Sequence, residues 1–83
     1  MVEQTQDLAG LVDSVVRPLV NHEEDLEITS HDEEGTTIIE ISVNEEDAGK
    51  IIGRQGRVIK SIRTLARAAA SRYNKRIDVE ILD

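Results

Sequence analysis

A four-residue loop with two glycines, Gly53-Arg54-Gln55-Gly56, is the part of this sequence best suited to binding chemistry. Two glycines three positions apart let the backbone turn tightly and let a ligand approach without meeting a Cβ atom. Gly56 stands at the start of a predicted helix, where unpaired backbone N–H groups and the helix dipole favour an anion. Basic side chains lie in and around the loop: Lys50, Arg54, Arg57 and Lys60. Together these residues predict a cradle for the phosphate groups of a chain that passes the loop.

The G-x-x-G spacing alone is weak evidence, because a glycine-rich turn between two helices can serve packing only. Three further features favour ligand binding. Isoleucines flank the loop on both sides, at positions 51, 52, 59 and 62. The loop falls between two predicted helices rather than between a strand and a helix. All basic residues of the chain except Arg17 gather around it.

The charges of the chain are strongly segregated. The net charge is −7, yet residues 50–76 carry nine basic residues and no acidic one, whereas residues 1–49 carry fourteen acidic residues. The basic residues are Lys50, Arg54, Arg57, Lys60, Arg63, Arg67, Arg72, Lys75 and Arg76. Because salt screens distant charges over about 10 Å, such a block attracts phosphates locally. The alternative is that these charges form ordinary solvated faces.

Other kinds of site find little support. The chain has no cysteine, which excludes a thiolate metal site and a cysteine nucleophile. His22 and His31 lie in acidic polar stretches and lack a third metal ligand at a suitable spacing. The acids at positions 45–47 are those that a helix N-terminus favours, and Ser61 and Ser71 have no base at a recognisable spacing. We therefore expect no enzyme, no metal and no cofactor.

The apolar pattern predicts one α+β domain over residues 1–83, with residues 1–6 as a disordered tail. The expected elements are a helix over 7–20, strands at 26–30 and 36–43 joined by a turn at 31–35, a short helix that Asn44 caps, a longer helix over 57–73, and a strand at 77–81. In the longer helix one buried arc is expected to contain Val58, Ile62, Leu65, Ala66, Ala69 and Tyr73. The order α-β-β-α-α-β predicts a three-stranded sheet with helices packed on one face.

At these residues the sequence resembles the KH domain family: an apolar pair, then G-x-x-G, then an apolar helix. An extra helix and strand ahead of this core resemble the type II, bacterial arrangement, and the resemblance covers nearly the whole chain. In KH domains this loop clamps about four nucleotides of nucleic-acid backbone. The resemblance implies that Gly53, Arg54, Gln55 and Gly56 contact phosphates, with Lys50, Arg57 and Lys60 close by. It places Ile51 and Ile52 beside the groove for bases, unless one or both face the core. Only Arg54 of the two variable loop positions is basic, so affinity is expected to be modest.

Tyr73 is the only aromatic residue, so stacking of bases on a row of rings is not available. Recognition is expected to depend on backbone clamping beside an aliphatic groove, which suits flexible single-stranded RNA. The resemblance to small stand-alone bacterial KH proteins implies an RNA chaperone or post-transcriptional regulator. It also implies a homodimer or a heterodimer with the larger KH protein KhpB. We expect the surface for this association to involve the short helix after Asn44 and the nearby glycines.

Two other functions compete with RNA binding: a protein-interaction adaptor, and an enzyme that binds a nucleotide at the glycine loop. The enzyme would need a base and metal ligands. No run of about 18 apolar residues exists that could span a membrane, and the N-terminus lacks the layout of a signal peptide, so a cytoplasmic location is expected.

Overall fold

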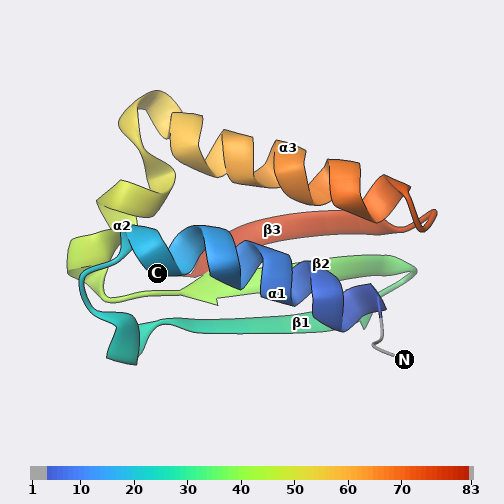
Figure 1. Ribbon diagram of the computed structural model, residues 1–83, viewed down its shortest axis with the longest axis horizontal. Helices are drawn as coiled ribbons and strands as arrows, with labels where there is room; N and C mark the ends of the chain where they lie inside the picture. Colours follow the sequence, from blue (N-terminus) through green and yellow to red (C-terminus); the bar gives the residue numbers. More distant parts are fainter. Residues whose placement is uncertain (1–3, 83) are drawn as a thin grey trace.

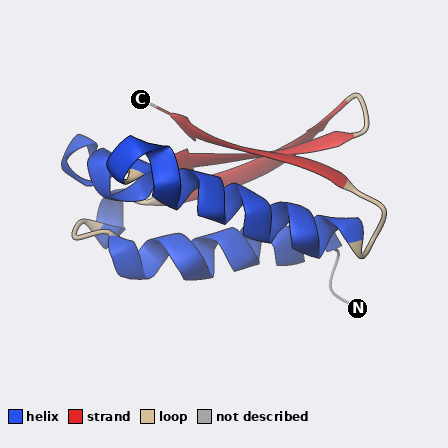
Figure 2. Ribbon diagram, turned by 90° about the horizontal axis from the view of Figure 1, so that it is seen from above, coloured by secondary structure: helices blue, strands red, loops and turns tan. Residues whose placement is uncertain are grey.

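Two long helices lie on one face of a three-stranded sheet in the computed structural model, which describes residues 4–82 (Figure 1). The elements are α1 (Gln4–Val16), β1 (Glu27–Glu33), β2 (Thr36–Ser42), α2 (Glu45–Ile52), α3 (Arg57–Ser71) and β3 (Arg76–Leu82), with single 3₁₀ turns at Arg17–Leu19, Glu23–Asp25 and Arg54–Gly56. The order α-β-β-α-α-β and the α+β class are therefore confirmed. Seen from above, the helices form one layer and the strands the other (Figure 2).

Helix α1 covers the sheet with Leu8, Val12 and Val16, which recur at every fourth position and are buried. It ends at Val16 rather than near residue 20, because Pro18 cannot supply the backbone N–H that would continue the ladder, and a 3₁₀ turn follows. It begins at Gln4, so it includes residues 4–6, which the sequence alone assigns to a disordered tail. Residues 1–3 of that expected tail lie outside the described residues.

The sheet has the order β1-β2-β3, with β1 antiparallel and β3 parallel to the central strand. Strand β1 is longer than expected and runs to Glu33, which pairs with Thr36. The turn is only Glu34-Gly35, and both residues have positive φ values of 52° and 85°. Two such residues in succession are typical of the type I′ turn, whose twist matches that of a hairpin, so the loop predicted at residues 31–35 is wrong in length.

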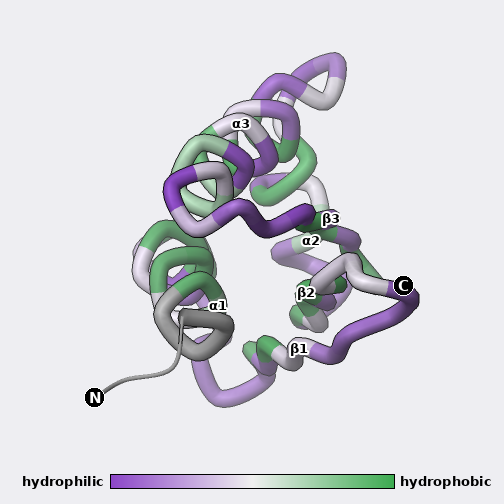
Figure 3. The backbone as a smooth tube through the Cα atoms, turned by 90° about the vertical axis from the view of Figure 1, so that its right-hand side faces the viewer, coloured by the Kyte–Doolittle hydropathy of each residue, from purple (hydrophilic) through white to green (hydrophobic). Residues whose placement is uncertain are grey.

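The face of the sheet toward the helices is apolar and carries the core. Ile39 and Ile41 of β2 and Val79 of β3 are buried on it. Figure 3 shows α1 and α3 along one side of the strands. The opposite face, which no helix covers, is more polar. It carries five acidic side chains, Glu27, Glu33, Glu40, Asp78 and Glu80, together with His31, Arg76, Ile38, Leu82 and smaller polar residues.

Helix α3 buries a stripe that differs from the predicted arc. The buried residues are Ile59, Ile62, Ala66 and Ala70, whereas Leu65 is 45% exposed. Tyr73, also largely exposed, lies beyond the helix end at Ser71. The stripe is rotated because α3 packs against both the sheet and α1. Asn74 adopts the expected left-handed conformation, with φ at 57°, in the turn that leads to β3.

Among residues 4–82, no helix combines the length and the apolar character that crossing a bilayer requires.

Candidate nucleic-acid interface

The short helix α2 carries the glycine loop at its C-terminal end and is fixed at its N-terminal end by Asn44. The Asn44 side-chain oxygen accepts a hydrogen bond from the Glu46 backbone N–H at 2.8 Å, which is the predicted N-cap. The same side chain donates to the Asp25 carboxylate at 2.9 Å. Asn44 therefore joins the start of α2 to the segment that precedes β1.

Asp47 fixes α2 more firmly, in a role that the sequence does not reveal. Its side chain is fully buried, and its two carboxylate oxygens accept hydrogen bonds from the backbone N–H groups of Asn21 and His22, each at 3.0 Å. Lys50 approaches the same carboxylate at 3.4 Å. These contacts lower the pKa of Asp47. The hydrogen bond from the Asn21 N–H has the largest effect, the His22 and Lys50 contacts act in the same direction, and burial opposes the shift. Asp47 is thus an anchor between α2 and the loop after α1, rather than only a charge at a helix terminus.

The glycine loop turns the chain sharply between α2 and α3. Gly53, Gln55 and Gly56 all have positive φ values, at 76°, 59° and 73°. The Gly53 N–H closes α2 by donating to the Gly49 carbonyl at 2.8 Å. Gly53 also lies against Val58, since a Cβ atom added there would overlap the Val58 Cγ2 atom. In Figure 1 the loop, in yellow, lies at the end of the molecule opposite the turn between α3 and β3.

The backbone N–H groups of the loop are less available to an anion than the sequence suggests. The Gly56 N–H donates to the Gly53 carbonyl at 3.1 Å, and the Arg57 N–H donates to the Arg54 carbonyl. These bonds form because the chain makes a 3₁₀ turn before α3 begins. The Gly56 and Arg57 N–H groups therefore already have backbone partners, and we expect side chains to supply more of the attraction for a phosphate.

Basic and polar side chains project from the loop and the first turn of α3. Arg54, Gln55, Arg57 and Lys60 are exposed, and Arg57 donates to the Gln55 side-chain oxygen at 3.2 Å. None of the three cations forms an ion pair with another described residue. Lys50 differs, because it is the counter-ion of buried Asp47. The structure thus brings three uncompensated cations together at the loop.

The two isoleucines before the loop have opposite environments. Ile51 is 0% exposed and belongs to the core, whereas Ile52 is 41% exposed. Successive residues of a helix point about 100° apart, and α2 packs on the core with the face that carries Ile51. The Ile51 side chain is therefore not available for contact with a base. Of the apolar pair, Ile52 alone can contact a ligand.

A second basic region, which the sequence analysis does not assign to the site, follows α3 to its other end. Arg67, Lys75 and Arg76 line an open pocket of about 420 Å³ together with Thr36, Ile77 and Asp78. Between this pocket and the loop, the Arg63 Nε atom donates to the Val79 carbonyl at 3.0 Å, on the free edge of β3. The spacing of Arg63 and Arg67 places them on one helix flank, but their position beside β3 follows only from the sheet order.

The charge of the molecule is therefore divided between its surfaces. Basic residues gather at the loop and around the pocket at Arg67, Lys75 and Arg76, while most of the acidic residues of the sheet lie on its open face, which Arg76 shares at the start of β3. A polyanion is attracted to the first surface and repelled by the second. A chain with a net charge of −7 can therefore still present one surface that attracts phosphate groups.

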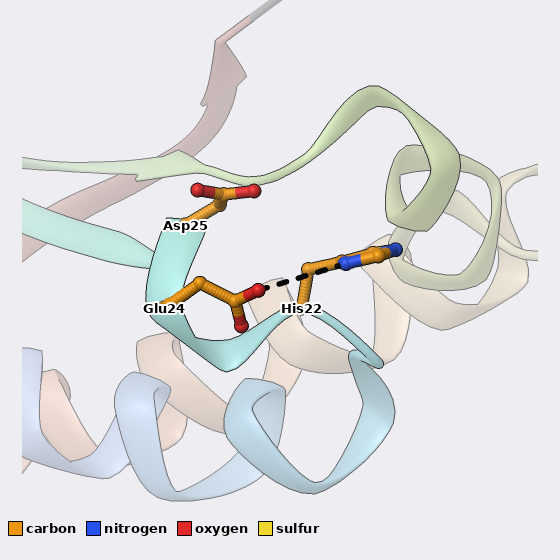
Figure 4. A group of neighbouring side chains, drawn as sticks. All are labelled: His22, Glu24 and Asp25. Atoms are coloured by element: carbon orange, nitrogen blue, oxygen red, sulfur yellow. Dashed lines mark ion pairs between the residues drawn. The ribbon is translucent and has the colours of Figure 1, made fainter.

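A group of side chains that could coordinate a metal ion lies away from the loop, in the segment before β1 (Figure 4). Atoms of His22, Glu24 and Asp25 lie within 4.8 Å of one another, so a third ligand does accompany His22. Two of the three groups have another role: the His22 Nε2 atom lies 2.8 Å from the Glu46 carboxylate, and the Asp25 carboxylate accepts a hydrogen bond from the Asn44 side chain. The Glu46 hydrogen bond raises the pKa of His22. These contacts hold the segment onto α2, and we assign no metal to them.

Comparisons of the sequence with known proteins give consistent matches. A family model described as "KhpA/KhpB, KH domain" matches residues 9–81. The chain is 44% identical over 73 residues to the RNA-binding protein KhpA of Listeria monocytogenes, which covers 88% of this chain and 96% of that protein. It is 42% identical to the KhpA of Borreliella burgdorferi, over 88% of this chain and 89% of that protein. It is 37% identical to the KhpA of Bacillus subtilis, over 94% of this chain and 96% of that protein. No solved structure gives a significant match.

Proposed function

The chain belongs to the KhpA/KhpB family of KH domains, and from that premise we propose that it binds single-stranded RNA by holding the RNA backbone on the loop Gly53–Gly56. The observation that carries the proposal is the cluster of three cations at the loop. Arg54, Arg57 and Lys60 are exposed and make no ion pair with another described residue. A phosphate placed beside them replaces water, and at Arg57 also the hydrogen bond to the Gln55 side-chain oxygen, without breaking an ion pair. Hydrogen bonds to charged groups are the strong ones in such contacts.

The proposed path of the RNA continues from the loop along the side of α3 that faces the β3 edge. Arg67, Lys75 and Arg76 offer positive charge at the far end of this path, around the open pocket. The path reaches Arg76 at the start of β3 and avoids the acidic side chains farther along the open sheet face, such as Glu40 and Glu80, which would repel phosphates. A single strand suits this surface because its backbone can bend to follow the loop and the helix.

Base recognition in this proposal depends on aliphatic contact. Ile52 is exposed beside the loop, and the only aromatic residue, Tyr73, lies at the other end of α3. Stacking on aromatic rings is therefore not available near the clamp, and hydrogen bonding is limited to groups such as Gln55. Because backbone contacts position the RNA without reading sequence, we expect weak discrimination between RNA sequences.

The proposed biological role is that of an RNA chaperone or post-transcriptional regulator in the cytoplasm, acting by binding rather than by catalysis. One domain that contacts about four nucleotides binds weakly. We propose that the chain compensates by forming a homodimer, or a heterodimer with KhpB. Joining two sites makes the second binding event intramolecular and raises the overall affinity without any new contact.

The proposal can be tested by fluorescence anisotropy with a labelled, unstructured RNA of eight to twelve nucleotides. Arg54→Gln removes one positive charge at the loop, and Thr29→Asp, on the open sheet face, changes the net charge by the same amount far from it. We expect Arg54→Gln to weaken binding several-fold and Thr29→Asp to leave it nearly unchanged. The double variant Arg54→Asp/Gln55→Asp should abolish binding with the circular dichroism of the fold intact. Equal binding by all four proteins would contradict the proposal.

A further inference from the structure

The open pocket at the end of α3 away from the glycine loop brings several positive charges together around one space. It has a volume of about 420 Å³, and its charged lining residues are Arg67, Lys75, Arg76 and Asp78. They come from three segments: α3, the turn after it, and the first residues of β3. Thr36, at the start of β2, also lines the pocket. We call this site the basic pocket.

The fold fixes the backbone on which the basic pocket is built. Strands β2 and β3 are parallel, so both begin at this end of the molecule, where Thr36 pairs with Arg76. The chain returns from α3 to β3 through a tight turn, in which the Lys75 N–H donates to the Ala70 carbonyl at 3.1 Å. Figure 1 shows this turn at the end opposite the glycine loop. Strand pairing and turn together therefore position Lys75 and Arg76 beside α3.

The charges of the basic pocket are not neutralised within the part of the chain that the structure describes, since none of its cations, nor Asp78, takes part in an ion pair there. Three positive charges and one negative charge give the pocket a net charge of +2. An internal phosphate of an RNA strand carries one negative charge. A terminal phosphate monoester carries about −1.5 to −2 at pH 7 and offers three acceptor oxygens. The charge of the pocket therefore matches a terminal phosphate better than an internal one.

We infer that the basic pocket binds a terminal phosphate group of the RNA, so that the protein prefers RNA with a phosphorylated end. The inference rests on the proposed function, in which the strand passes from the loop along α3, and it names the part of the RNA at the far end of that path. An arginine guanidinium can donate two parallel hydrogen bonds to phosphate oxygens, and a lysine acts as a point charge. Arg67 and Arg76 supply the first kind of contact, and Lys75 supplies the second.

The basic pocket acts separately from the glycine loop because the two are far apart. Arg57 and Arg67 are ten residues apart in α3, which is about 15 Å along the helix at 1.5 Å per residue. This distance exceeds the screening length of about 10 Å in 0.1 M salt. Substitutions at sites this far apart usually have additive effects. The preference for a phosphorylated end should therefore be separable from clamping of the backbone at the loop.

Competition binding with the full chain tests the inference. Three unlabelled ten-nucleotide RNAs of one sequence, with a 5′ phosphate, a 3′ phosphate or hydroxyl groups at both ends, displace a labelled RNA. We expect one phosphorylated RNA to bind wild type several-fold more tightly than the hydroxyl RNA, and we expect Arg67→Gln to abolish this preference. Arg72→Gln is the matched control and should keep the preference, because Arg72 is an exposed cation near the same end of α3 but does not line the pocket.

Equal binding of the three RNAs to wild type would overturn the inference, as would a preference that Arg67→Gln retains or that Arg72→Gln loses to the same extent. Displacement of the phosphorylated RNA by an equal concentration of uridine monophosphate would assign the pocket to a free nucleotide and would also overturn it. The clamp is tested separately by Arg54→Gln, which should weaken binding of all three RNAs by the same factor and leave the preference unchanged. Wild-type affinity of Arg54→Gln would contradict the clamp alone.

Backbone amide chemical shifts of the ¹⁵N-labelled chain locate the phosphate directly. Spectra are compared between the protein saturated with the preferred phosphorylated RNA and the protein saturated with the hydroxyl RNA. The differences between these two complexes should be largest at Arg67 and over residues 75–77, and small over the loop Gly53–Gly56. Differences confined to the loop would place the terminal phosphate at the clamp and would refute the inference.

Discussion

The two glycines of the loop are expected to differ sharply in their tolerance of alanine, with Gly53 the more sensitive. Gly53 has φ at 76° and ψ at 172°, a region that essentially only glycine occupies, and an L residue there costs about 1–3 kcal/mol. An added Cβ would also lie 2.8 Å from the Val58 backbone nitrogen, which cannot move unless α3 moves. Overpacking of this kind costs about 1–3 kcal/mol more. Gly53→Ala should therefore lose about 2–6 kcal/mol of unfolding free energy.

Gly56→Ala is the matched comparison. Gly56 has φ at 73° and ψ at 18°, which is the ordinary left-handed region, and its added Cβ would meet only the Lys60 Cε atom at 4.0 Å. The cost should be the left-handed strain alone, about 1–2 kcal/mol. Gly49→Ala lies inside α2 with open space around the new methyl group, and it should gain about 0.5–1 kcal/mol.

Urea unfolding followed by circular dichroism measures all three variants. An 83-residue domain has a total stability of about 4–12 kcal/mol, at about 0.05–0.15 kcal/mol per residue. Gly53→Ala should therefore remove a large share of the stability and shift the urea midpoint by more than 1 M, if the m-value is about 1–2 kcal/mol/M. A cost for Gly53→Ala no greater than that for Gly56→Ala would refute the reasoning about Val58 and the loop geometry.

Two further predictions concern residues near the loop. Ile51→Ala should lower the unfolding free energy by about 2–5 kcal/mol in urea unfolding, because the Ile51 side chain is fully buried. Ile52→Ala should change the unfolding free energy by less than about 0.5 kcal/mol and should weaken RNA binding instead, because the Ile52 side chain is exposed. Similar stability losses for the two variants would contradict their assigned environments. His22 has a raised folded pKa, so its pairing with Glu46 contributes stability that is fully present below the unfolded pKa of about 6.5 and is lost as pH rises through the folded value. The difference in urea midpoint between wild type and His22→Gln should accordingly shrink from about pH 5.5 to about pH 8.5, and a constant difference would exclude the ion pair as its cause.

Much of the fold follows from local pattern. The alternation of apolar residues in β2 and β3 and the cap at Asn44 are short-range signals, and the structure bears them out. The helix and turn boundaries are less well predicted, since they depend on Pro18 and on the exact turn type at Glu34-Gly35. Leu65 and Tyr73 are assigned wrongly to the buried arc because helical periodicity does not state which second helix packs beside α3.

The candidate site follows the same division between local and tertiary information. The loop and its cations are local features, so the sequence predicts them. The buried anchor at Asp47 depends on backbone groups of Asn21 and His22, more than twenty residues away, and no spacing rule predicts it. The basic pocket at Arg67 and Arg76 likewise depends on the parallel pairing of β2 and β3.

The salt dependence of RNA affinity tests the central proposal most directly. For a single strand, the logarithm of affinity falls with the logarithm of salt concentration by about 0.7 for each phosphate neutralised. Arg54, Arg57 and Lys60 together predict a slope of about −2 or steeper for wild type, and Arg54→Gln should reduce the steepness by about 0.7. A folded Arg54→Gln protein with the wild-type affinity and slope would contradict the assignment of the loop Gly53–Gly56 as the RNA clamp.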